Sequence, residues 1–155
     1  MNISELLNER LILPNLAGTT KQHVMEEIVE HLATVQQGIN AGELLKALLE
    51  REKLGSTGIG NGIAIPHGKL AGLSDIILVF ARSTGGIPFE AIDGKPIHLI
   101  FLLVAPANST GGHLKALARL SRLLKNDGFR RALLTAPTAQ DILSAIIDED
   151  NRTAI

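Results

Sequence analysis

The stretches DIILVFARS, at residues 75–83, and PIHLIFLLVA, at residues 96–105, are apolar at nearly every position. A strand with one face in water alternates apolar and polar residues, whereas a strand buried on both faces is apolar throughout. The segment between them, TGGIPFEAIDGK at 84–95, carries Gly-Gly and Asp-Gly turn signals. The sequence therefore predicts two neighbouring strands in a sheet that is covered on both faces.

Helices are predicted on both sides of these strands along the chain. Apolar residues recur at helical spacing within five segments, namely from Thr20 to about Gln36, from about Ala41 to Lys53, from Gly112 to Lys125, at 129–136, and from Thr138 to Ile147. Thr20 is the expected cap of the first helix, and Asp127-Gly128 is expected to end the third helix. There is no internal repeat or linker, so we expect one layered α/β domain.

The composition argues against several classes of protein. A chain of 155 residues with a net charge of −1 has no electrostatic footprint for nucleic acid. Four phenylalanines are the only aromatic residues, which is too few for base stacking, and the lack of cysteine excludes disulfides and thiolate metal sites. The N-terminus lacks signal-peptide features, and the longest apolar run is too short to cross a bilayer. We expect a soluble cytoplasmic domain without membrane insertion.

The run GSTGIGNGIAIPHGK, at residues 55–69, holds five glycines. Gly55 and Gly60 have the separation of a P-loop, but Asn61 and Gly62 stand where lysine and Ser or Thr are needed. A dinucleotide fingerprint would need a third glycine in place of Ile63 or Ile65, and it would follow a strand, whereas this run follows a predicted helix. The run is therefore not a nucleotide-binding loop.

Two interpretations of the run remain open. It is either a plain irregular turn or a stiff mount for His67, since Pro66 fixes φ and Gly68 lets the chain leave in almost any direction. Glycine N–H groups beside the ring could also bind an anion. A neutral imidazole, about three quarters of the population at pH 7, can attack phosphorus without a partner base.

Two more residues suit phosphoryl chemistry. His113 opens a predicted helix, where phosphate oxygens are favoured, although a capping or surface histidine would look the same. Arg51 lies in the last helical turn before the glycine run, where an arginine also commonly serves as a partner of the helix dipole.

The other histidines carry weaker signals. His98 lies inside an apolar strand and is expected to be a satisfied core residue. His23, Glu27 and His31 share one helix stripe, but no third imidazole or thiolate joins them, so we expect no metal site.

Together, Arg51-Glu52-Lys53, the run at 55–69 and the later His113 resemble enzyme IIA of the bacterial phosphotransferase system. The resemblance is to the fructose/mannitol-type family, with most likeness to its nitrogen-regulatory branch, and it covers nearly the whole chain. It implies one type-2 IIA domain over residues 1–155, folded as an α/β/α sandwich around a mixed sheet of about five strands. Sugar-transporting members commonly belong to larger chains, so the length of this chain favours the regulatory branch.

The same resemblance implies roles for three residues. His67 would accept phosphate from an HPr-like histidine phosphocarrier as a tele-phosphohistidine, with His113 stabilising the phosphate and Arg51 as a cation beside it. No cofactor is implied. The phosphorylation state would then regulate protein partners such as potassium transporters or sensor kinases. The alternatives are a sugar-transport IIA that passes phosphate to a IIB protein, and an interaction module that is not phosphorylated.

Overall fold

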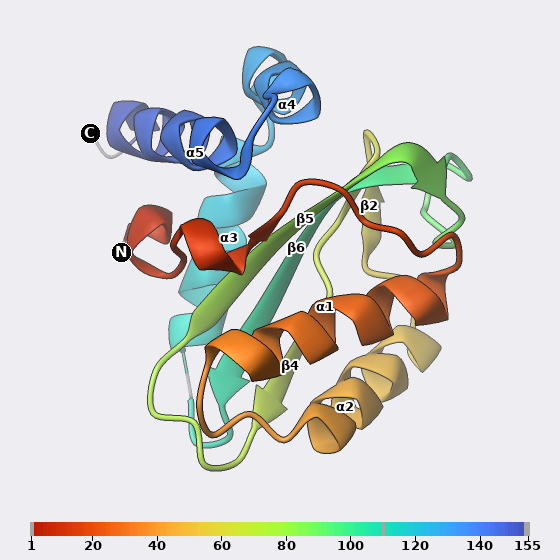
Figure 1. The fold of residues 1–155 in the computed structure, drawn as a ribbon, viewed down its shortest axis with the longest axis vertical. Helices are drawn as coiled ribbons and strands as arrows, with labels where there is room; N and C mark the ends of the chain where they lie inside the picture. The colour runs from red at the N-terminus through yellow and green to blue at the C-terminus, as the bar shows by residue number, and fades with distance from the viewer. Residues whose placement is uncertain (1, 110, 154–155) are drawn as a thin grey trace.

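The computed structural model describes residues 2–109 and 111–153 (Figure 1). Its elements, in chain order, are the 3-10 helices η1 (Ile3–Glu5) and η2 (Glu9–Leu11), β1 (Ile12–Leu13), α1 (Lys21–Val35), α2 (Ala41–Lys53), β2 (Gly58–Gly60), β3 (Ile63–Ala64), β4 (His67–Leu70), β5 (Ile77–Ile87), β6 (Ile97–Pro106), α3 (Gly112–Leu123), α4 (Asp127–Thr135) and α5 (Ala139–Thr153).

The two apolar stretches form the centre of the sheet. β5 and β6 pair antiparallel, with Phe80 opposite Phe101 and their rings edge-to-face at 5.0 Å between centroids. β1 pairs parallel with β5, and both β3 and β4 pair parallel with β6, while β2 continues the sheet beyond β3 in the antiparallel sense. The sheet is therefore mixed, as predicted, and it has six strands where about five were expected.

Helices cover both faces of this sheet. α1 and α2 pack against each other, with α1 on β5 and α2 on β4, and α3 contacts β6 from the opposite side (Figure 1). Every residue of β6 is buried except His98, which is half-buried. The α/β/α layering that the apolar strands and the resemblance predicted is confirmed.

Side-chain caps explain where several helices begin. The Thr20 hydroxyl accepts a hydrogen bond from the His23 amide, as predicted, and Asn40 caps α2 in the same way. Asn126 accepts from the amide of Phe129, so Asp127 and Gly128 begin α4 and do not form a separate break. The predicted turn at Gly85-Gly86 was also wrong, because β5 continues through it to Ile87 with a shifted register.

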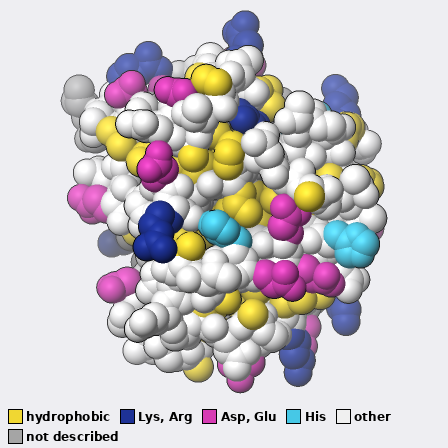
Figure 2. All heavy atoms as spheres, in the orientation of Figure 1, with side chains coloured by type: hydrophobic (Ala, Val, Ile, Leu, Met, Phe, Trp, Pro, Cys, Tyr) yellow, Lys and Arg dark blue, Asp and Glu magenta, His cyan; other side chains and the backbone are white. Residues whose placement is uncertain are grey.

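The surface mixes charges of both signs. On the face drawn in Figure 2, acidic and basic side chains are interspersed among small apolar groups and do not separate into patches. Within residues 2–109 and 111–153, no helix combines the length and apolar character needed to cross a bilayer.

Candidate functional site

One cavity lies where the end of α2, the start of β4 and the start of α3 come together. Its volume is about 180 Å³. It is lined by Ala47, Arg51, His67, Gly68, Lys69, Leu103, Ala105 and His113. The fold thus brings together the three residues singled out from the sequence, although 62 positions separate the first from the last. Gly68 faces α2, where a Cβ would make ordinary contact with Leu48 Cδ2 at 3.4 Å.

His67 is held at the first position of β4. Its ring nitrogen Nδ1 lies 3.0 Å from the carbonyl oxygen of Ile65. A carbonyl oxygen only accepts hydrogen bonds, so Nδ1 carries the proton and Nε2 keeps its lone pair. The half-buried ring therefore keeps Nε2 free of this bond, and the short step back to Ile65 across the buried Pro66 fixes the ring direction.

His113 lies in the first turn of α3, half-buried in the cavity wall. Its Nδ1 atom is buried and has no hydrogen-bond partner among the described residues. Burial lowers the pKa of His113 below its ordinary value, and the nearby charges of Lys69 and His67 lower it further. His113 is therefore neutral at pH 7 and offers one N–H donor and one lone pair.

Arg51 serves the end of its helix and the cavity at once. Its Nη1 donates a hydrogen bond of 2.8 Å to the carbonyl oxygen of Gly55, just past the C-terminus of α2. The helix-end role considered from the sequence is thus present. The same side chain lines the cavity, and a guanidinium group is chemically suited to bind the oxygens of an anion there.

Lys69 is a cavity residue that sequence reasoning missed. Its Nζ donates a hydrogen bond of 2.9 Å to the carbonyl oxygen of Ser109. Residues two apart on a strand point to the same face, so the strand register of β4 would have placed Lys69 beside His67. No strand was predicted within the run at 55–69, so this alternation could not be applied to it.

The glycines of this run do not form an anion-binding wall. Of the five, Gly68 lines the cavity, whereas Gly58, for example, accommodates Ala91, whose Cβ would lie 2.9 Å from an added Cβ. The run is organised instead by Glu52, a residue of α2. Its carboxylate accepts from the amide and the hydroxyl of Thr57, at 3.1 and 2.5 Å, and pairs with Lys21 at 2.7 Å.

The remaining histidines lie elsewhere. His98 Nδ1 is bonded to the carbonyl oxygen of Ser83 at 3.0 Å, as expected for a satisfied core residue. On α1, Glu27 accepts from the amides of two preceding loop residues, and His31 Nε2 bonds the carbonyl oxygen of Arg10. No group of three metal-binding side chains occurs in the part of the chain that the structure describes.

Known proteins resemble this chain along almost its whole length. The profile of the family described as "Phosphoenolpyruvate-dependent sugar phosphotransferase system, EIIA 2" matches residues 5–149. A nitrogen regulatory protein of Bradyrhizobium diazoefficiens is 42% identical over 94% of this chain and 95% of its own length. The fructose-specific EIIABC component of Bacillus subtilis is 38% identical over 97% of this chain and 24% of its own length. The crystal structure of the nitrogen regulatory protein IIA-Ntr from Neisseria meningitidis superposes with a TM-score of 0.86, at 35% identity, covering 93% of this chain and 98% of that one.

Proposed function

The chain belongs to the EIIA 2 family of the phosphoenolpyruvate-dependent sugar phosphotransferase system, and we propose that it is a phosphoryl-accepting regulator of the nitrogen-related branch. In this proposal an HPr-like histidine phosphocarrier phosphorylates His67. The observation that carries it is the shared cavity, which His67 lines together with Arg51 and His113 while its Nδ1 is bonded to the Ile65 carbonyl. The likeness to nitrogen regulatory proteins supports the branch.

The transfer needs one bond made and one bond broken. The lone pair of His67 Nε2 attacks the phosphorus on the donor histidine, and the donor P–N bond breaks with its electron pair returning to the donor ring. The proton on Nδ1 stays hydrogen-bonded to the Ile65 carbonyl, whose oxygen stabilises the positive charge gained by the phosphorylated ring. The product is a tele-phosphohistidine.

The cavity residues stabilise the transferred group. Phosphoryl transfer depends mostly on positioning and on charge stabilisation. Arg51 supplies a guanidinium, and neutral His113 donates one hydrogen bond without repelling the attacking ring. A positive charge and a neutral hydrogen-bond donor thus line the cavity together with His67.

Phosphorylation would regulate partners by adding charge to a docking surface. Leu114, which follows His113 in the sequence, is 59% exposed, and Leu54, three residues after Arg51, is 85% exposed. A phosphoryl group on His67 adds close to two negative charges. A target such as a potassium transporter or a sensor kinase that docks over His67 and these leucines would then bind the unphosphorylated form better, because burial of the phosphate is unfavourable.

A direct assay tests the proposal. Incubation with phosphoenolpyruvate, enzyme I and an HPr-like carrier should add one acid-labile phosphate per chain. His67→Ala should lose this phosphate, and His113→Ala should take it up more slowly. His23→Ala changes an exposed position of α1 and should behave as wild type. A stable label in His67→Ala would refute the assignment, and no uptake by the wild-type protein would leave the interaction-module alternative.

A sugar-transport role is the second candidate. The observation favouring it is the 38% identity to a fructose-specific EIIABC component. It predicts that phosphorylated protein passes its phosphate to a fructose- or mannitol-type IIB protein about as fast as it receives it. The regulatory proposal predicts slow or absent transfer to such a IIB protein.

A further inference from the structure

Lys69 joins the cavity to the turn that leads into α3. Its Nζ donates to the carbonyl oxygen of Ser109 at 2.9 Å. One residue later in β4, the carbonyl oxygen of Leu70 accepts from the amide of Ala107 at 3.1 Å. The turn at 107–109 is thus attached to β4 at two points, one through the backbone and one through the Lys69 ammonium group.

The ammonium group has an uncharged partner in this position. Its bond to the Ser109 carbonyl is charge-assisted only on the donor side, whereas a dianionic acceptor would add the attraction between opposite charges. Lys69 also lines the cavity that holds His67, and the alternation of β4 places both side chains on one face. A dianionic phosphoryl group on His67 would therefore compete for the ammonium group at short range.

We propose that Lys69 transmits the phosphorylation state: its ammonium group leaves the Ser109 carbonyl and binds the phosphoryl group on His67, which frees the Ser109 end of the turn at 107–109 while the backbone bond from Ala107 to Leu70 remains. This inference rests on the proposed phosphorylation of His67. It makes Lys69 a second cation for the phosphate besides Arg51. It also makes the turn, and the exposed Ala107 and Asn108 within it, part of the surface that differs between the two states.

The surroundings of Lys69 suit this exchange. Its stem has four rotatable carbons and the residue is exposed, so the ammonium group can swing without moving the backbone of β4. Arg51 is less free, because its Nη1 is bonded to the carbonyl oxygen of Gly55. The proximity of Lys69 to the second histidine is independently visible, since its charge is the second cause, after burial, of the lowered pKa of His113.

Substitution of Lys69 separates this role from the proposed function. Lys69→Met should still accept one phosphate on His67, but about 10- to 100-fold more slowly, the cost of losing one charged donor to the phosphoryl group. Lys69→Arg should recover most of the rate. Lys125→Met removes an exposed lysine just past the other end of α3 and should transfer at the wild-type rate.

Amide NMR spectra recorded with and without phosphate give the second readout. The amides of Ala107, Asn108 and Ser109 should shift on phosphorylation of the wild-type protein and of Lys125→Met. In Lys69→Met the side-chain bond to Ser109 is absent from the start, so these amides should shift before phosphorylation and change little after it. Wild-type transfer by Lys69→Met, or an unchanged response of these amides, would overturn the inference while leaving His67 phosphorylation intact. Failure of the wild-type protein to take up phosphate would overturn both.

Discussion

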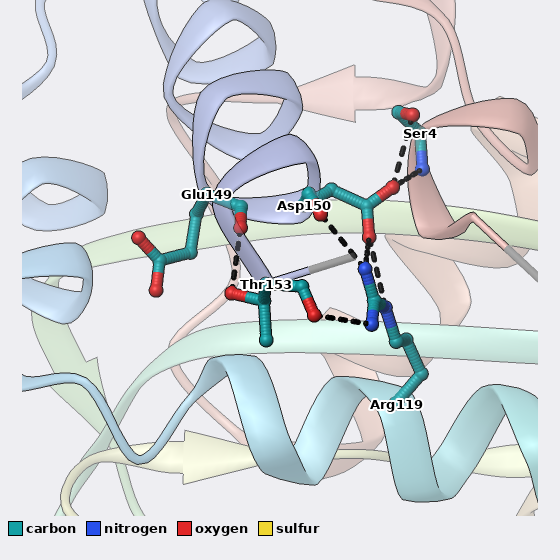
Figure 3. A network of polar contacts seen from close by, with 5 residues as sticks. All are labelled: Ser4, Arg119, Glu149, Asp150 and Thr153. Carbon is teal, nitrogen blue, oxygen red and sulfur yellow. Dashed lines mark hydrogen bonds and ion pairs between the residues drawn. The ribbon is translucent and has the colours of Figure 1, made fainter. Parts of the chain in front are cut away.

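A buried ion pair ties the C-terminal helix to the rest of the protein, and its removal gives a quantitative prediction. The Asp150 side chain is fully buried, and its carboxylate accepts from Arg119 Nε and Nη2 at 3.0 and 2.8 Å and from the Ser4 amide and hydroxyl at 3.0 Å each (Figure 3). Arg119 also donates to the backbone carbonyl oxygens of Asp150 and Thr153. The pair therefore connects η1, α3 and the last turn of α5.

We expect Arg119→Met to destabilise the fold by about 3 to 5 kcal/mol, the usual cost of leaving one charge of a buried pair without its partner. Only the two Ser4 donors would remain on the Asp150 carboxylate. For a chain of this length, about 2 to 4 °C of melting temperature is lost per kcal/mol, so the midpoint should fall by about 6 to 20 °C. The double variant Arg119→Met/Asp150→Leu removes both charges and should recover most of the loss.

Urea and thermal unfolding followed by circular dichroism measure both values. Arg131→Met is the matched control, because it removes an arginine from an exposed pair with Asp127, in which the two side chains are 73% and 68% exposed. Its effect should be close to zero. Equal effects of Arg119→Met and Arg131→Met would refute the reasoning, as would a double variant no more stable than Arg119→Met. Phosphate uptake well below the melting temperature should be unaffected in all three variants.

Two further predictions concern the cavity and its support. The folded-state pKa of His113 lies below its ordinary value of 6.5, so His113 takes up a proton in the unfolded chain at a higher pH than in the folded protein. The contribution of His113 to stability should therefore be constant above pH 6.5 and be lost as the pH falls below it. NMR titration of its ring should give a midpoint under 6.5, rising in Lys69→Met, and a midpoint at or above 6.5 in the wild type would contradict the burial argument. Glu52→Ala should cost about 1 to 3 kcal/mol in urea unfolding, because the buried amide and hydroxyl of Thr57 lose their acceptor; Glu50→Ala, on the exposed side of α2, is its control, and equal losses would argue against this anchoring role.

The elements predicted correctly are those whose signal is local. α1, α2 and the central strands β5 and β6 each contain enough residues for a periodic or continuous apolar pattern to show in the sequence. The strands β1 and β3 have two residues each, which is too short for any pattern, and they exist because distant residues pair with them, as Ile12 does with Phe80. Their formation depends on tertiary structure, which a window of sequence does not contain.

The end of the last helix was missed for a related reason. The prediction ended it at Ile147, the last residue before the acidic and polar segment DEDNRT. The helix instead continues to Thr153, since Glu149 and Asp150 are buried and hydrogen-bonded, the first to Asn126 and the second to Arg119 and Ser4. A buried carboxylate with partners far along the chain looks, in sequence, like an exposed one.

The place of the cavity follows from the direction in which two strands pair. β4 and β6 run parallel, with His67 opposite Leu103 and Lys69 opposite Ala105, so both strands leave the sheet at the same edge. The chain after β6 enters α3 within a few residues, which places His113 at that edge too. The cavity thus lies beside the last residues of β6, whereas His67 is the first residue of β4. The motif at 55–69 singled out His67 from the sequence, but the parallel pairing of β4, which the sequence did not predict, explains why His67, Lys69 and His113 meet.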